Sequence, residues 1–201
     1  MPFWSANFGS TEELLKDPKR NFRFYINIQG ISTENGGAML WYAKQVSKPT
    51  FTLAEATHEY LNHTYYYPGK ITWNAIEITM VDPGGDPDVT ATLAGILVGA
   101  GYNLPDTPDS EKLTSMSKQK AAGALGQVKI TQVDAEGQMV EEWTLWNAFA
   151  TEVDFGGTLA YGNDELTEVK LKLRYDWAEL NTAAEGSAVA NVDSKFFDIS
   201  R

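Results

Sequence analysis

Residues 168–177 alternate strictly between polar and apolar side chains. One side of this pattern carries Val169, Leu171, Leu173, Tyr175 and Trp177, and the other carries Glu168, Lys170, Lys172, Arg174 and Asp176. A period of two places successive side chains on opposite faces of a β-strand. The pattern therefore predicts a strand with one buried face and one charged face. In a chain with a net charge of −11, three cations on one strand face call for an explanation.

Similar stretches predict a chain built mainly from strands. We expect strands over residues 21–31, 39–53, 71–81 and 165–180, and a hairpin over 126–149 that turns at 134–137. The strand that begins near residue 56 is expected to turn at Pro68–Gly69, because proline and glycine commonly mark turns. Pro49 has no N–H to donate to a ladder, so its position belongs at a sheet edge or a bulge.

Helical patterns are fewer. Residues 10–18 read as a short helix that Asp17–Pro18 ends, and residues 87–102 read as one longer helix with apolar positions at helical spacing. A short segment rich in Ala and Lys follows at 115–125. The predicted organisation is an N-terminal arm over 1–20, one β domain over 21–180 and a C-terminal arm over 181–201.

Composition excludes several classes of protein. The 201 residues hold 16 Lys and Arg against 27 Asp and Glu, a net charge of −11, which disfavours binding to nucleic acid through a basic patch. The chain has no cysteine, which rules out disulfides and thiolate chemistry and fits folding in a reducing cytoplasm. We expect no secretory signal at the N-terminus and no membrane insertion, because the longest apolar run, 93–102, is too short to span a bilayer.

Candidate catalytic and metal sites are weak. His58, Glu59 and His63 do not match the zinc-protease spacing, because the two histidines are five residues apart and would point to different faces of a helix or a single strand. Asp82, Asp86 and Asp88 lack the spacing of a calcium loop and fit a turn that caps the next helix. Glu141 and Glu142 are neighbours on a strand and cannot form a carboxylate pair. We therefore expect no enzyme, no metal and no cofactor.

Aromatic residues instead indicate contacts between subunits. Tyr65, Tyr66 and Tyr67 fall at the expected hairpin tip, where their mixed polar and apolar character suits an interface. The C-terminal arm is small and polar until Phe196 and Phe197, which read as an anchor on the same or a neighbouring subunit. The candidate contact residues are Glu59, Tyr60, His63, Tyr65, Tyr66, Tyr67, Phe196 and Phe197.

Five stretches together resemble the tail tube proteins of contractile-tailed bacteriophages. They are "RNFRF" at 20–24, "AKQVSKPTF" at 43–51, the strand entered through Trp73, "TMVDP" at 79–83 and "LRYDW" at 173–177. The resemblance runs from about residue 18 to about residue 180, in the family's order.

The resemblance implies a two-sheet β-sandwich with one flanking helix. Six copies would form a ring in which one sheet of each subunit joins a continuous β-barrel, and rings would stack into a tube inside a sheath. The implied partners are further copies of the chain and the sheath, baseplate and tail terminator proteins of a virion, with DNA passing through the lumen without specific binding. Tubes of type VI secretion systems and R-type pyocins share this architecture.

A tube that conducts DNA is expected to have an acidic or small polar lumen, because each cation that meets a phosphate adds affinity. The lumen candidates are Glu77, Thr79, Glu142 and Thr144, on the polar faces of their strands. Lys170, Lys172 and Arg174 are expected to face away from the lumen or to lie near carboxylates. Two alternatives stay open: a monomeric carbohydrate-binding β-sandwich that uses Tyr65–Tyr67, and a type VI secretion tube subunit.

Overall fold

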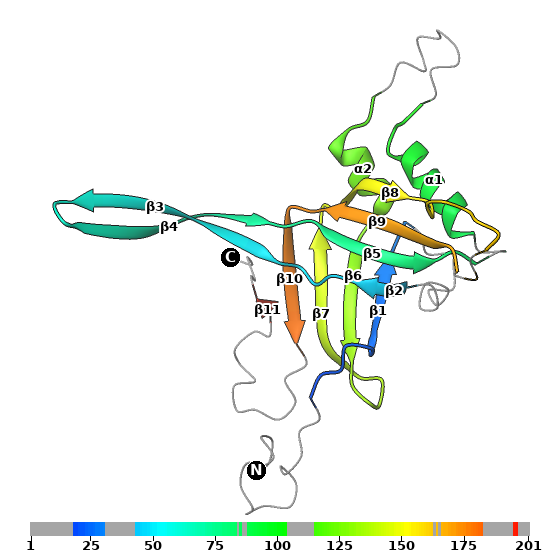
Figure 1. Cartoon of the computed structure of the whole chain (residues 1–201), viewed down its shortest axis with the longest axis horizontal. Helices are drawn as coiled ribbons and strands as arrows, with labels where there is room; N and C mark the ends of the chain where they lie inside the picture. Colours follow the sequence, from blue (N-terminus) through cyan, green and yellow to red (C-terminus); the bar gives the residue numbers. More distant parts are fainter. Residues whose placement is uncertain are drawn as a thin grey trace, which may run out of the picture.

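The computed structural model describes residues 18–30, 43–83, 85, 88–103, 115–162, 164, 166–182 and 195–196. Its described strands form two larger sheets and one two-stranded sheet, and its described helices are α1 and α2. Figure 1 shows that the strands of the larger sheets cross, that the helices lie beside one of them, and that the two-stranded sheet projects as a long arm. The prediction of a mainly β, two-sheet sandwich is confirmed. The short helix expected at 10–18 and the turn expected at 31–38 lie largely or wholly outside the described residues.

Both sheets of the sandwich are antiparallel. The five-stranded sheet has the order β1 (Phe24–Ile28), β6 (Val128–Val133), β7 (Met139–Trp146), β10 (Trp177–Thr182) and β11 (Lys195–Phe196). The four-stranded sheet has the order β2 (Ala43–Val46), β5 (Ile76–Val81), β9 (Glu168–Arg174) and β8 (Phe149–Asp154). Strand β8 was not predicted as a separate element.

The core lies between the two sheets, and alternation along the strands builds it. Ile76, Ile78 and Met80 on β5 face inward beside their register partners Leu173, Leu171 and Val169 on β9. The five-stranded sheet supplies the opposing layer: Ile26, Ile28, Val128, Ile130, Leu145 and Ala178. Burial of these side chains provides most of the stabilisation of such a sandwich.

Within the part of the chain that the structure describes, two helices lie beside the sandwich, where the resemblance implied one flanking helix. Helix α1 (Val89–Gly99) begins after Asp88, whose side chain accepts a hydrogen bond from the backbone N–H of Ala91 at 2.9 Å. The "DPGGDPD" turn thus caps a helix at Asp88, as expected. Helix α2 (Lys118–Leu125) begins after Ser117, which caps it in the same way, and it gives the Ala- and Lys-rich segment a helical form that was not predicted.

The alternating stretch at 168–177 is not a single strand. Strand β9 ends at Arg174, and after a bend at Asp176 the chain enters β10, which belongs to the other sheet. Val169, Leu171, Leu173 and Tyr175 are buried as predicted, whereas Trp177 is 37% exposed. The prediction for Trp177 is wrong because the change of sheet places its side chain on the outer face.

The arm consists of β3 (Phe51–Tyr60) and β4 (His63–Trp73), which form a two-stranded sheet of their own. Its turn is Leu61–Asn62, where Leu61 has a φ of 54°. The predicted turn at Pro68–Gly69 is therefore wrong, because these residues form a bulge inside β4 opposite Leu53–Glu55. The bulge needs glycine, since a Cβ at Gly69 would meet the carbonyl oxygen of Ala54 at 2.9 Å.

Candidate assembly surfaces

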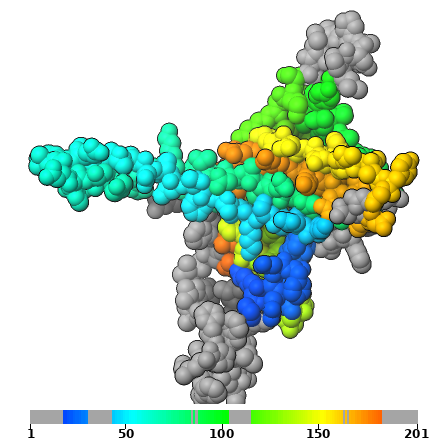
Figure 2. Space-filling model, viewed as in Figure 1, coloured from blue at the N-terminus to red at the C-terminus, as the bar shows by residue number. Residues whose placement is uncertain are grey.

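The arm exposes apolar side chains along its whole length. Strand β2 continues into β3 and β4 continues into β5, so the arm extends the β2–β5 pair of the sandwich beyond its edge (Figures 1 and 2). Tyr65, Tyr66 and Tyr67 are 46%, 68% and 54% exposed, and every residue of β3 is exposed. An isolated two-stranded hairpin is marginally stable in water, so a bare arm of this length indicates a partner surface.

The register sorts the arm into two sides. Near the base, Phe51 and Leu53 lie on one face with their partners Trp73 and Ile71, and the Phe51 and Trp73 rings meet edge to face with centroids 5.4 Å apart. Beyond the bulge the apolar face is the other one. It carries Ala56, His58, Tyr60, His63, Tyr65 and Tyr67, while Glu55, Thr57, Glu59, Thr64 and Tyr66 occupy the opposite face.

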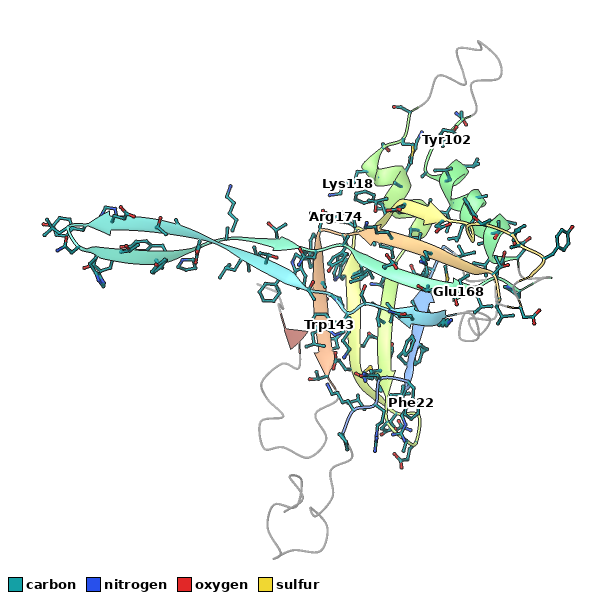
Figure 3. The ribbon with its side chains drawn as sticks, viewed as in Figure 1. Phe22, Tyr102, Lys118, Trp143, Glu168 and Arg174 are labelled. Carbon is teal, nitrogen blue, oxygen red and sulfur yellow. The ribbon has the colours of Figure 1, made fainter. Side chains whose placement is uncertain are left out.

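Twist brings these two apolar faces to the same side of the arm. Figure 1 shows β3 above β4 near the tip and below it near the base, so the ribbon turns over between the two halves. Two-stranded ribbons twist strongly. The apolar face of the base and the aromatic face of the tip therefore point in the same direction, and the arm is amphipathic along its length. Figure 3 shows the side chains standing off the arm beyond the body of the protein.

The arm also changes the geometry of the two histidines. The turn at Leu61–Asn62 separates His58 from His63, so they lie on different strands and share the aromatic side, contrary to the single-strand expectation. Glu59 lies on the opposite side. Within the described residues, no group of three or more His, Asp or Glu side chains could hold a metal ion.

The charged face of β9 is matched by its neighbours in the four-stranded sheet. Lys172 lies between Glu77 on β5 and Glu152 on β8, and its ammonium is 3.3 Å from the Glu152 carboxylate. Lys170 lies opposite Asp154 in the same ladder. Lys172 thus has carboxylates on both neighbouring strands, and Lys170 has Asp154 on one side and Thr79 on the other.

The four lumen candidates do not lie on one surface. Glu77 and Thr79 project from the outer face of the four-stranded sheet, and Thr79 is only 8% exposed. Glu142 and Thr144 lie on the outer face of the five-stranded sheet, where Glu142 pairs with Lys129 at 3.0 Å and Thr144 is only 4% exposed. A lumen lined by one sheet could take one of these pairs but not both.

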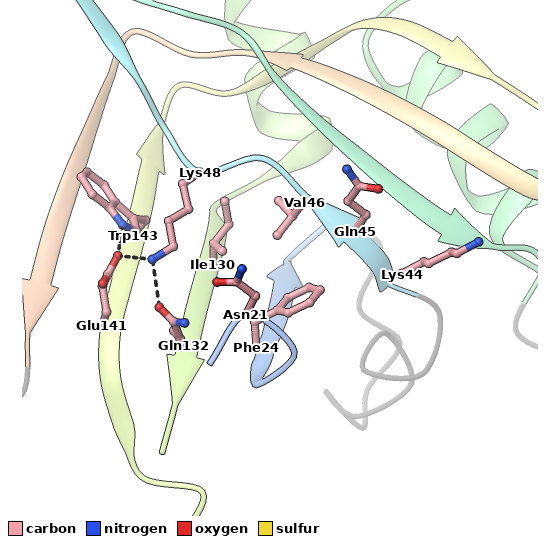
Figure 4. Close-up of a pocket in the computed structure, with 10 residues that line it drawn as sticks. All are labelled: Asn21, Phe24, Lys44, Gln45, Val46, Lys48, Ile130, Gln132, Glu141 and Trp143. Atoms are coloured by element: carbon pink, nitrogen blue, oxygen red, sulfur yellow. Dashed lines mark hydrogen bonds and ion pairs between the residues drawn. The ribbon is translucent and has the colours of Figure 1, made fainter. Parts of the chain in front are cut away.

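A cleft lies between the five-stranded sheet and β2, and we call it the β1–β2 cleft (Figure 4). Its volume is about 370 Å³. Its lining mixes apolar and polar side chains, and the polar Gln132 and Glu141 are among its buried residues. The lining residues are Asn21, Phe24, Lys44, Gln45, Val46, Lys48, Ile130, Gln132, Glu141 and Trp143. Strands β1 and β2 each end their sheets, so the cleft lies on the side of the sandwich where two terminal strands come together.

Glu141 anchors the inner wall of this cleft. Its carboxylate accepts hydrogen bonds from Lys48 at 2.8 Å and from the Trp143 indole at 2.6 Å, and it also pairs with Lys19. Burial alone would raise the pKa of Glu141, but these hydrogen bonds outweigh burial and lower the pKa to about 2. Glu141 therefore stays ionised and ties β7 to the stretch that follows β2. The alternating pattern hinted at this inward position, because Glu141 shares the phase of Leu145 on β7, but its cationic partners are distant in sequence.

Two features lie near the β10 end of the five-stranded sheet. Strand β11 pairs with Leu180 and Asn181 of β10, so the backbone of Phe196 lies against the protein's own sheet. Phe197 lies outside the described residues. Trp146 and Trp177 stack on the outer face with ring centroids 6.0 Å apart. This pair was not predicted, because Trp177 was expected to face the core.

Known structures share this fold. A chain of the anti-feeding prophage tube-terminating cap has a TM-score of 0.60 and 13% identity, with 89% of this chain and 100% of that one covered. A chain of the anti-feeding prophage baseplate has a TM-score of 0.58 and 16% identity, with coverage of 84% and 98%. A chain of the sheath/tube terminator of the extracellular contractile injection system PVC has a TM-score of 0.58 and 13% identity, with coverage of 84% and 99%.

Comparison of the sequence with protein families and curated proteins gave no match. The structural likeness shows the fold alone: the chain has the β-sandwich fold of these chains from contractile injection systems, as the resemblance predicted. Among the helices that the structure describes, none is long and apolar enough to cross a membrane.

Proposed function

We propose that the protein is the tube subunit of a contractile, phage-tail-like machine. In this proposal six copies close into a ring, rings stack into a hollow tube, and sheath, baseplate and terminator proteins are the partners. The observation that carries the proposal is the exposed amphipathic arm on a tube-type sandwich. The arm needs a partner surface, and a ring of identical subunits supplies one for every arm.

The free edges of the sheets support ring closure. In the five-stranded sheet, β1 is the terminal strand at one end and β10 with its short partner β11 forms the other end. A head-to-tail contact between such ends repeats around a symmetry axis and closes a ring. Closure also removes open edges that would otherwise invite aggregation.

We assign the lumen to the outer face of the five-stranded sheet, with Glu142 and Thr144. On this face Lys129 is paired with Glu142, and its neighbours include Thr131, Glu179 and Asn181. The outer face of the four-stranded sheet carries more cations, among them Lys170, Lys172 and Arg174. With a net charge of −11, the chain favours a conduit that lets DNA slide without binding it.

Cysteine labelling tests the lumen assignment, because the chain has no native cysteine. Glu142→Cys and Glu77→Cys are prepared as a matched pair, one on each outer face. In assembled tubes, we expect a large polymer-linked maleimide to label Glu77→Cys and to be excluded from Glu142→Cys, while a small maleimide labels both. If the large reagent instead labels Glu142→Cys and is excluded from Glu77→Cys, the lumen is lined by the four-stranded sheet. The tube assignment would be unaffected by that result.

Assembly itself is tested by mass photometry across a concentration series. The proposal predicts hexamers and larger species that grow with concentration. A monomer at every concentration would contradict it and would favour the monomeric carbohydrate-binding alternative.

A further inference from the structure

We propose that β11 is a removable cover on the β10 edge of the five-stranded sheet, and that it must leave this edge before a ring can close. This inference rests on the proposed ring and adds a step that regulates its assembly. The cover belongs to the chain itself, so each free subunit restrains its own polymerisation. Two observations carry the inference: the edge that β11 occupies, and the regularity of the terminal strands.

The first observation is the place of β11 in the sheet. Strand β10 pairs with β7 along one side, and β11 pairs with Leu180 and Asn181 along the other (Figure 1). A strand can form backbone ladders on two sides only. The β1 strand of a second copy therefore cannot pair with the whole of β10 while β11 is bound there.

The second observation is that the terminal strands of the two sheets differ. Strands β2 and β8, which end the four-stranded sheet, each carry a register shift, at Ala43–Gln45 and at Ala150–Glu152. Irregularities of this kind protect an edge against strand addition. Strands β1 and β10 pair with β6 and β7 without a shift. The five-stranded sheet thus has two regular edges that are suited to strand addition, and β11 covers one of them.

The lengths of the ladders indicate that the cover can be displaced. Strand β11 pairs through two residues, whereas all five residues of β1 pair with β6, so a neighbour's β1 can form the longer ladder on β10. Opening a short ladder costs little, because the separated groups bond to water. Covering one edge is enough, since each head-to-tail contact uses the β10 edge of one copy and the β1 edge of the next. The concentration needed for assembly rises as the fraction of subunits with an open edge falls.

A reversible disulfide tests the inference. Leu180 and Phe196 are register partners, so Leu180→Cys with Phe196→Cys can lock β11 onto β10 in a chain that has no native cysteine. At a concentration where the chain is monomeric, mild oxidation should form this bond within one chain and abolish labelling by maleimide. The oxidised chain should then form no rings even at a concentration roughly 100-fold above that at which its reduced form assembles.

The matched control is Glu77→Cys with Lys172→Cys, which are register partners on β5 and β9 in the other sheet. This pair should assemble equally well in both redox states. If the first disulfide does not form in the monomer, or if the oxidised chain assembles as well as the reduced one, the inference is overturned and the proposed function stands. A native chain that never assembles would contradict the proposed function and this inference with it.

The rate of assembly gives a second readout that needs no cysteine. Lys195→Pro weakens the β11 ladder because proline has no N–H to donate, and Lys195→Ala makes the same charge change with an ordinary backbone. The lag before light scattering rises should be roughly threefold shorter for the proline variant than for the alanine variant. This lag is separate from the stability of finished tubes, which the predicted anchor at Phe196 and Phe197 affects. Equal lags would show that β11 does not restrain assembly.

Discussion

Leu171 and Leu173 on β9 are fully buried between the two sheets. Truncating either to alanine removes apolar contacts and leaves a cavity, so we expect the free energy of unfolding to fall by about 2–5 kcal/mol. Urea denaturation of the isolated subunit measures the loss. Lys170→Ala on the outer face of the same strand is the control and should change it by less than about 0.5 kcal/mol. Equal effects would show that the two faces of β9 are wrongly assigned.

Glu141 makes the stability of the fold depend on pH. Its pKa falls from an ordinary value of 4.5 to about 2 on folding, so its ion pairs stabilise the protein fully above pH 4.5. That contribution is lost as the pH falls toward 2, because the unfolded chain takes up the proton first. The shift corresponds to roughly 3 kcal/mol.

The comparison with Glu141→Gln isolates this contribution. At pH 7 the variant should unfold at lower denaturant concentration than the native chain, and the difference should shrink between pH 4.5 and pH 2. A difference that stays constant over this range would contradict the role given to the ionised carboxylate.

At the scale of elements, the tyrosine run is expected to act in assembly. Replacing Tyr65, Tyr66 and Tyr67 with serine should leave the sandwich folded, because among the described strands β3 and β4 pair only with each other. The replacement should weaken polymerisation strongly. Circular dichroism checks the fold and light scattering checks assembly. Unchanged polymerisation would remove these residues from the interface.

The C-terminal arm is the second element to test. Residues 181 and 182 belong to β10, so the deletion begins at 183. We expect the truncated chain to fold and its rings or tubes to dissociate at lower temperature or denaturant concentration, since the deletion removes Phe196 and Phe197, which the sequence predicts to act as an anchor. Loss of the monomer fold would instead make the arm part of the core.

The strands were predictable where one face is buried, because burial imposes the period of two that β5 and β9 display. The arm turn was not predictable in this way. Leu61–Asn62 has no glycine, whereas Pro68–Gly69 has the composition of a turn and forms a bulge. The change of sheet between Arg174 and Trp177 was also hidden, since alternation continues across the bend and does not reveal which sheet a strand joins.

Distant pairings were the other limit of sequence analysis. The partners of Glu141 are Lys19, Lys48 and Trp143, and only the last is near it in sequence. The aromatic character of residues 60–67 was visible from the sequence, but its continuity with Phe51 and Leu53 depends on register and twist. The sequence therefore predicted which residues make contacts but not that they form one continuous surface.

For the whole molecule, the arm, the terminal strands and the excess of carboxylates fit one assembly. The sandwich has its own core, and apart from Trp73 at its base the arm lies outside that core. Carboxylates on β5 and β8 lie beside the lysines on the charged face of β9. A subunit of this kind folds around its own core. It also exposes surfaces that are covered only when identical neighbours bind to them.

Negative-stain electron microscopy of the purified protein tests this central claim most directly. At high protein concentration, we predict rings and short hollow cylinders with six subunits around the axis, and the Tyr65–Tyr67 serine variant should give few or none. Uniform single particles of subunit size at every concentration, for the native chain, would contradict the tube assignment.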